Sequence, residues 1–189
     1  FEEGIQLKQQ YGEKNVFDLS LGNPLLEPPQ KFKKKIISLA NSNEKGMHRY
    51  MPNPGFISTR KAIADNLNNE FSINVSLDEV IVTTGAAGGL NSVLKTLLNP
   101  QDEIIIFAPF FVEYLFYVSN HNGKSVIAKT DKDFLPDLED LKNKISKKTK
   151  AIIINSPNNP TGVLYPKETL QKLGEIIQEK EKNLGTEIY

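Results

Sequence analysis

Residues 155–162 read NSPNNPTG and follow directly after the apolar run Ala151–Ile154. A proline has no backbone N–H and pushes the residue before it toward extended geometry, so two prolines in eight positions end a strand. An asparagine amide can donate a hydrogen bond to a phenolic oxygen, or it can cap the segment that follows. The segment is therefore predicted to turn at the end of a buried strand, and either to cap the chain or to hold a ligand there.

Residues 85–89 read GAAGG and lie between the apolar run Val80–Val82 and a helical pattern that starts at Leu90. Free backbone N–H groups at the start of a helix can hold a phosphate, and small side chains allow a ligand to approach closely. A tight turn that merely precedes a helix explains this loop equally well. The loop is not a dinucleotide fingerprint, which needs G-x-G-x-x-G and an acidic residue roughly 20 positions later. This pattern counts against a nicotinamide-binding oxidoreductase.

Aromatic residues occur in two further loops. Phe110 and Phe111 follow Pro109 at the end of a third apolar run. A ring exposed there can stack on a flat ligand, although two adjacent phenylalanines are more often core residues. Tyr50 lies in the loop RYMPNPG and by itself indicates little.

Strand and helix patterns alternate through most of the chain. We expect the strands at 80–82, 103–107, 125–129, 150–155 and 187–189, and the helices at 90–98, 111–120, 138–145 and 166–183. This alternation predicts an α/β fold, with a mostly parallel sheet and helices on both faces. Ligands bind such sheets at the carboxyl ends of the strands, so the three loops should open on one rim. Before them we expect a short strand at Val16–Leu21 and a helix capped by Ser58 that runs to about Phe71.

Composition excludes several classes of function. Lysine plus arginine and aspartate plus glutamate both total 23, so no net field attracts nucleic acid or anionic lipid. With no cysteine and two histidines, we expect no metal site. No apolar run approaches the roughly 20 residues that span a bilayer, and no signal-peptide pattern opens the chain, so we expect a cytoplasmic protein. The lysine-rich stretches 31–35 and 142–150 are expected to be solvated helix faces.

Taken together, the motifs resemble the class I family of fold-type I aminotransferases, which use pyridoxal 5′-phosphate (PLP). The resemblance covers essentially the whole chain. It rests on LSLGNP at 19–24, YMPNPG at 50–55, VTTGAAGGLN at 82–91, APFFVEY at 108–114 and NSPNNPTG at 155–162. The last motif is the most specific, and the others gain weight from their order and spacing.

The resemblance implies a role for each matching residue. The N–H groups around Gly85, Ala86 and Ala87 resemble the phosphate cradle, and Phe111 resembles the ring that stacks on the pyridine. Asn159 is similar to the partner of the ring oxygen O3′, with cis peptide bonds before Pro160 and Pro109.

Two further positions lie outside these loops. Tyr50 resembles the tyrosine that reaches the phosphate of the neighbouring subunit, which implies a homodimer, and Gly22 resembles the loop position beside the substrate carboxylate. Ala87 and Phe111 depart from the commoner residues at their positions, which reduces the phosphate donors and the stacking area.

The same resemblance implies groups that this sequence lacks. The family's Schiff-base lysine, the aspartate on the pyridine nitrogen and the arginine on the substrate carboxylate have no matching motif here. We therefore expect a fragment, with an N-terminal arm and small-domain segment at 1–45 and the first part of the PLP-binding large domain at 46–189. By itself it is predicted to be inactive, with no catalytic residue assigned.

The activity expected of the parent protein is transfer of an amino group from an amino acid to a 2-oxo acid. A PLP-dependent C–S β-lyase and a non-catalytic PLP- or phosphate-binding module remain the alternatives.

Overall fold

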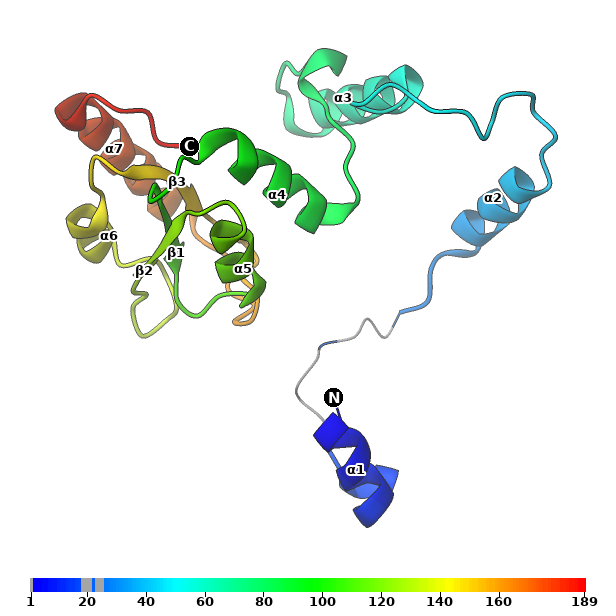
Figure 1. The fold of residues 1–189 in the computed structure, drawn as a ribbon, viewed down its shortest axis with the longest axis horizontal. Coiled ribbons are helices and arrows are strands. Elements are labelled where there is room, and N and C mark those ends of the chain that lie inside the picture. The colour runs from blue at the N-terminus through cyan, green and yellow to red at the C-terminus, as the bar shows by residue number, and fades with distance from the viewer. Residues whose placement is uncertain (1, 18–21, 23–25) are drawn as a thin grey trace. The chain divides into compact units, whose positions relative to one another are not determined.

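The computed structural model describes residues 2–17, 22 and 26–189, in two compact units, Phe1–Tyr50 and Met51–Tyr189. The first unit contains α1 (Glu2–Tyr11), a short 3-10 helix η1 (Glu13–Asn15) and α2 (Gln30–Ala40) (Figure 1). None of these three helices has a buried residue within its own unit. Most of the strand expected at Val16–Leu21 lies outside the described residues.

The second unit contains the sheet and the helices around it. Its elements are α3 (Ile57–Phe71), the 3-10 helix η2 (Leu77–Glu79), α4 (Gly85–Leu97), β1 (Glu103–Phe107), α5 (Glu113–Ser119), β2 (Lys124–Ala128), α6 (Leu138–Lys144), β3 (Thr149–Ile153) and α7 (Lys167–Leu184). The α/β alternation from 103 onward is confirmed.

The sheet is parallel and has the order β2-β1-β3, so the first strand in sequence is central. Ile105 of β1 lies opposite Val126 of β2 and opposite Ile152 of β3. Tyr189 extends the pairing beyond β3, because its N–H donates to the Lys150 carbonyl at 2.9 Å and its carbonyl accepts from the Ile152 N–H at 2.8 Å. The strand start expected at 187–189 is therefore visible as a parallel pairing on the outer edge of β3.

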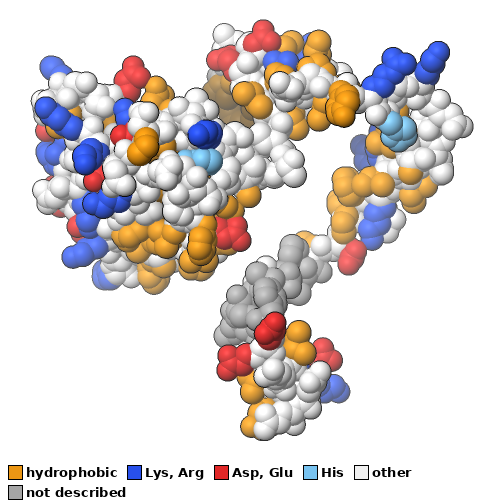
Figure 2. Space-filling model, in the orientation of Figure 1, with side chains coloured by type: hydrophobic (Ala, Val, Ile, Leu, Met, Phe, Trp, Pro, Cys, Tyr) orange, Lys and Arg blue, Asp and Glu red, His pale blue; other side chains and the backbone are white. Residues whose placement is uncertain are grey.

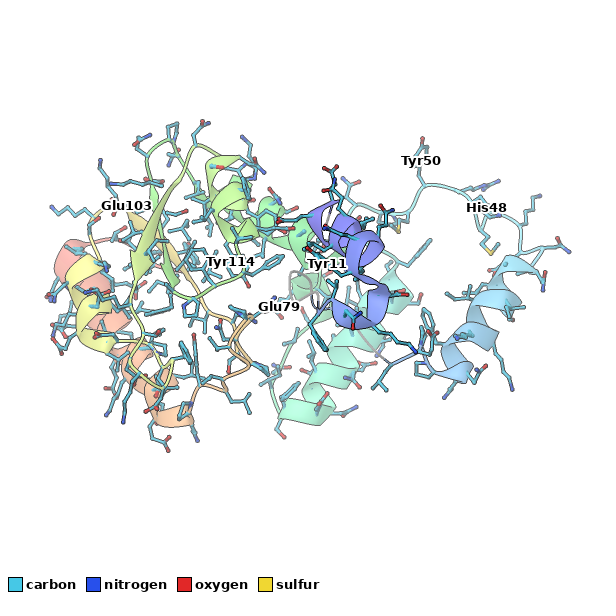
Figure 3. All side chains as sticks on the ribbon, turned by 90° about the horizontal axis from the view of Figure 1, so that it is seen from below. Tyr11, His48, Tyr50, Glu79, Glu103 and Tyr114 are labelled. Atoms are coloured by element: carbon cyan, nitrogen blue, oxygen red, sulfur yellow. The ribbon has the colours of Figure 1, made fainter. Side chains whose placement is uncertain are left out.

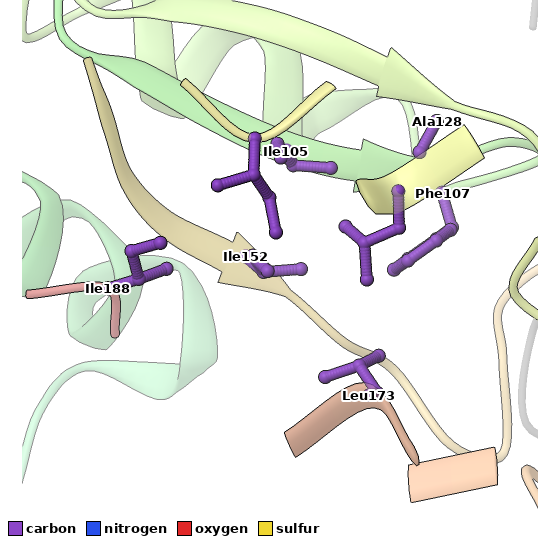
Figure 4. Close-up of a cluster of buried hydrophobic side chains, with 8 residues drawn as sticks. Ile105, Phe107, Ala128, Ile152, Leu173 and Ile188 are labelled. Carbon is purple, nitrogen blue, oxygen red and sulfur yellow. The ribbon is translucent and has the colours of Figure 1, made fainter. Parts of the chain in front are cut away.

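The central strand is buried on both faces, and alternate residues enter two separate cores. Ile105 and Phe107 pack with Leu141 of α6 and Leu173 of α7 on one face (Figure 4). Ile104 and Ile106 pack on the other face in a cluster whose helical members are Leu94, Tyr117 and Val118. Helices thus cover both faces of the sheet, with α6 and α7 on one and α4 and α5 on the other (Figure 1). A strand buried on both faces is typical of parallel sheets.

Two expectations for the segment before β1 were wrong. Val80–Val82 forms no strand, because its backbone groups have other partners: the Val80 carbonyl accepts from Arg60 and the Val82 N–H donates to the Pro54 carbonyl. Ser58 does not cap α3, which starts at Ile57 after Phe56 and has no side-chain cap.

Side chains of both charges occur on the face of the second unit seen in Figure 2, where Lys and Arg predominate. In the lysine-rich stretch 142–150, Lys142 pairs with Glu179 at 3.1 Å and Lys144 pairs with Asp140 at 2.6 Å. The hydrogen bond from Lys144, together with one from the Lys129 amide, holds the pKa of Asp140 below its ordinary value. These lysines therefore contact acidic neighbours on the helix surface.

The core on the α7 face predicts the cost of truncating a buried leucine. Leu173 is 3% exposed, whereas Leu170 on the same helix is 39% exposed. We expect Leu173→Ala to lower the free energy of unfolding by about 2–5 kcal/mol, and Leu170→Ala by about 1 kcal/mol or less. Urea denaturation of the two variants measures both values, and equal losses would contradict the assignment of this core.

Candidate functional site

The NSPNNPTG segment forms a turn that its own backbone closes. The Asn158 N–H donates to the Val163 carbonyl at 2.9 Å, and the Gly162 N–H donates to the Asn158 carbonyl at 2.7 Å. The Asn155 side chain accepts from the Asn159 N–H at 2.8 Å. The Asn159 side chain is exposed, and no hydrogen bond to it occurs within the described part of the chain. The turn therefore leaves one asparagine amide free for a ligand.

Cis peptide bonds occur at both of the positions expected from the resemblance, Ala108–Pro109 and Asn159–Pro160. A third cis bond precedes Pro157, which the sequence did not lead us to expect.

Asn158 joins this turn to the loop that follows β1. It is only 7% exposed, and its side-chain amide donates to the Pro109 carbonyl at 3.1 Å and to the Thr161 hydroxyl at 3.0 Å. Sequence reasoning missed this residue, because two adjacent asparagines look alike until the structure shows which one is buried. The loops after β1 and β3 thus meet at one rim of the sheet, as expected for two of the three loops.

The two phenylalanines of the β1 loop have different environments. Phe110 packs against the core beneath α4 and α5, whereas Phe111 is half-buried beside that core. The Phe111 ring meets Tyr114 edge-on, with 5.7 Å between ring centroids and 84° between planes. Figure 3 labels Tyr114 on α5, and burial raises the pKa of its hydroxyl. Phe110 is the core residue of the pair, and Phe111 is the one with ring surface to offer.

The third loop is part of a helix, which corrects the expectation of a turn that precedes one. α4 begins at Gly85, whose φ of +68° is a conformation that L side chains rarely adopt. The Gly85 N–H already donates to the Thr83 carbonyl at 2.9 Å, so it is not a free donor. The N–H groups of Ala86 and Ala87 lie in the first turn, where no intrahelical acceptor exists, and both residues are exposed.

Several contacts hold the segment that enters α4. Arg60 is 8% exposed and donates from Nε to the Val80 carbonyl at 2.9 Å and from Nη2 to Asp78 at 3.1 Å. Gly89 allows Thr83 to lie close to the helix, since a Cβ at Gly89 would be 3.2 Å from the Thr83 hydroxyl. No local sequence pattern predicts this role of Arg60, because its partners lie about twenty residues away in sequence.

These features fit a phosphorylated, flat ligand. The start of α4 has exposed, unsatisfied N–H donors and a positive end of the helix dipole, and nothing lies within 4 Å of a Cβ placed at Gly85. Asn159 adds a free amide and Phe111 adds a ring. The residues present therefore match the groups that a PLP phosphate, ring oxygen and ring face require.

The two remaining predicted residues are both exposed. The Tyr50 side chain points into solvent (Figure 3), and Gly22 has open space where a Cβ would lie. Neither observation tests the role that the resemblance implies for them.

Other possible sites are less suitable. A cavity of about 640 Å³ lies at the outer edge of β3, lined by Lys150, Glu181, Glu187 and Tyr189 among others, and away from the rim. In the described part of the chain no cluster of three or more histidine and acidic side chains could hold a metal. No helix there has the length and apolar character needed to cross a membrane.

Comparison with known proteins decides the family. The sequence profile of Aminotransferase class I and II matches residues 14–184. The chain belongs to this family. The sequence motifs resemble those of the PLP-dependent class I members of this family.

Relatives and solved structures agree with this assignment. The chain is 38% identical over 87% of its length to a Methanocaldococcus jannaschii protein named "Probable aspartate aminotransferase", and 36% identical over 87% to the aspartate aminotransferase of Bacillus subtilis. An aminotransferase structure from Eubacterium rectale superposes on 100% of the chain with a TM-score of 0.95 and 35% identity. The chain covers 43% and 42% of the two relatives and 48% of the solved chain. It thus spans less than half the length of the aminotransferases it matches.

The start of α4 gives a test of anion binding. Ala87→Asp places a carboxylate in the first helical turn. There it stabilises the helix by about 0.3–1 kcal/mol through the helix dipole, but it repels a bound phosphate. We expect PLP affinity to fall at least about tenfold while the melting temperature of the cofactor-free protein stays level or rises. Ala87→Asn introduces a side chain of the same size as aspartate but without its charge, so this variant should lose less PLP affinity. Equal PLP affinity in Ala87→Asp and Ala87→Asn would exclude this turn as the anion site.

Proposed function

We propose that the complete protein is a PLP-dependent aminotransferase that transfers an amino group from an amino acid to a 2-oxo acid. The observation that carries the proposal is the junction of the two rim loops, which brings the Asn159 turn and the Phe111 loop together in a chain of this family. Since both curated relatives described above are named aspartate aminotransferases, aspartate is the first amino acid to test.

Each candidate residue has a role that its local geometry supports. The N–H groups of Ala86 and Ala87 bind the phosphate, because they are exposed at the start of α4 and have no acceptor in the first turn. Gly85 supplies the backbone conformation rather than a donor, since its N–H is already bonded. Asn159 donates from its amide to the ring oxygen O3′, and Phe111 packs on the ring face.

The chain's own residues bind and orient, and the cofactor supplies the chemistry. PLP, when bound, provides an electron-accepting ring for the transfer of the amino group. The Asn159 amide orients the ring through its oxygen and stabilises negative charge there. The half-buried Phe111 side chain limits the access of water to one face of the cofactor ring. The edge contact between Phe111 and Tyr114 limits the rotation of the Phe111 ring.

The remaining expectations stay predictions. We propose that Tyr50 reaches the phosphate of a neighbouring subunit in a homodimer and that Gly22 lies beside the substrate carboxylate. We also propose an arm and small-domain segment at 1–45 and a large-domain part at 46–189. The compact units divide nearby, between Tyr50 and Met51. Cytoplasmic location rests on the sequence alone.

Asn159→Ala tests the cofactor assignment. Loss of the amide should shift the absorbance of bound PLP and lower kcat/KM at least about tenfold, because a hydrogen bond to a charged group is worth about 1.5–3 kcal/mol. Asn143→Ala, an exposed change on α6, is the matched control and should leave both unchanged. An unaltered spectrum and rate in Asn159→Ala would remove Asn159 from the site.

The 189-residue chain by itself should show no turnover. None of its lysines lies in a motif that matches the family's cofactor-binding lysine. Purified chain is incubated with PLP, aspartate and 2-oxoglutarate, and glutamate formation is measured. Glutamate formation above that of PLP alone would show that the chain carries a catalytic lysine that the motifs do not reveal.

A further inference from the structure

Asn158 is a buried polar side chain at the centre of the rim, next to the proposed PLP partner but not itself exposed. Its amide uses both N–H donors, one on the Pro109 carbonyl at 3.1 Å and one on the Thr161 hydroxyl at 3.0 Å. One planar group therefore contacts its own loop at Thr161 and the loop after β1 at Pro109, which lies 49 residues before Asn158 in sequence.

Among the described residues, this amide makes the sole hydrogen bond between the two loops. Within the described chain, no other hydrogen bond joins residues 108–112 to residues 155–163. Thr130 holds the same β1 loop at the Ala108 carbonyl, but from the β2 side. Without the Asn158 amide, the turn that carries Asn159 and the loop that carries Phe111 would be held together only by their strands and by packing.

The two hydrogen-bonded residues, Asn158 and Pro109, are close in sequence to the proposed ligand-binding residues. Asn159 is the next residue after Asn158, and Phe111 is two residues after Pro109. A hydrogen bond across the loops therefore sets the separation of the Asn159 amide from the Phe111 ring. If both are to contact one rigid ring, this separation must match the ligand.

We propose that Asn158 is a positioning residue for the cofactor site, which sets the spacing of Asn159 and Phe111 without touching the cofactor. This inference rests on the proposed function. It assigns to the buried asparagine a role in PLP binding beyond the folding of its own loop.

The test uses the complete protein and the isosteric variant Asn158→Asp. The carboxylate keeps the size of the side chain, but it has no donor for the Pro109 carbonyl and faces that oxygen with a negative charge. The matched control is Asn68→Asp. Asn68 also joins two segments through its side chain, donating to the Val75 carbonyl at 2.8 Å and accepting from the Val75 N–H at 2.7 Å, at the end of α3.

We expect the PLP dissociation constant of Asn158→Asp to rise about tenfold and the absorbance of bound PLP to shift. Asn68→Asp should lose a similar amount of thermal stability but stay within about twofold of the wild type in PLP affinity, with an unchanged spectrum. A PLP dissociation constant and spectrum of Asn158→Asp like those of Asn68→Asp would overturn the positioning role and leave it a structural residue.

A double variant tests the route of the effect. If Asn158 acts through Asn159, then Asn158→Asp should weaken PLP binding less in an Asn159→Ala background than in the wild type. Two fully additive losses would contradict this route.

A second pair of variants covers failure of Asn158→Asp to fold. Thr161→Val removes the acceptor that orients the Asn158 amide toward Pro109, and also the acceptor of the Val163 N–H at 3.3 Å. It should raise the PLP dissociation constant about threefold, whereas Thr161→Ser keeps the hydroxyl and should match the wild type. Unchanged PLP affinity in Thr161→Val would overturn the proposal. A wild-type protein that binds no PLP would instead refute the proposed function itself.

Discussion

The burial of β1 on both faces is the constraint on which the rest of the structure depends. Four consecutive residues, Ile104 to Phe107, are at most 3% exposed. A strand in this position needs a neighbouring strand on each edge and a layer of helices on each face. Parallel pairing supplies the neighbouring strands, and the helical connections between parallel strands supply the layers. Parallel strands also end at the same edge, so the loops after β1 and β3 are brought together by the sheet before any specific contact forms.

The specific contacts then turn a common edge into a defined site. The Asn158 amide selects one arrangement of the two loops, and the division of Phe110 and Phe111 between core and rim follows from the way the first loop leaves the strand. At α4, Gly85 allows the chain to enter the helix in a left-handed conformation. The N–H groups of the next two residues lack an intrahelical acceptor, as in any first helical turn, and both residues are exposed. Local backbone and amide geometry therefore determines which groups these loops and the start of α4 offer to a ligand.

Periodicity predicted the sheet well and the contacts within the rim poorly. The strand Glu103–Phe107 was expected at its observed bounds, because a short apolar run between turn residues leaves few alternatives. Val80–Val82 has the same apolar character but forms no strand, since Arg60 and Pro54 occupy its backbone groups. The burial of Asn158 depends on a partner 49 residues away, which no local pattern contains. The family motifs named the residues of the rim, whereas the structure showed which of them are exposed, which are bonded and which hold others in place.

The most direct measurement is a crystal structure of the complete protein with PLP. We expect the phosphate to lie on the N–H groups of Ala86 and Ala87, the Asn159 amide to lie within hydrogen-bond distance of the ring oxygen, and the Phe111 ring to lie against the pyridine. A cofactor bound elsewhere, for example in the cavity beside Lys150 and Tyr189, would contradict the assignment of the rim as the site.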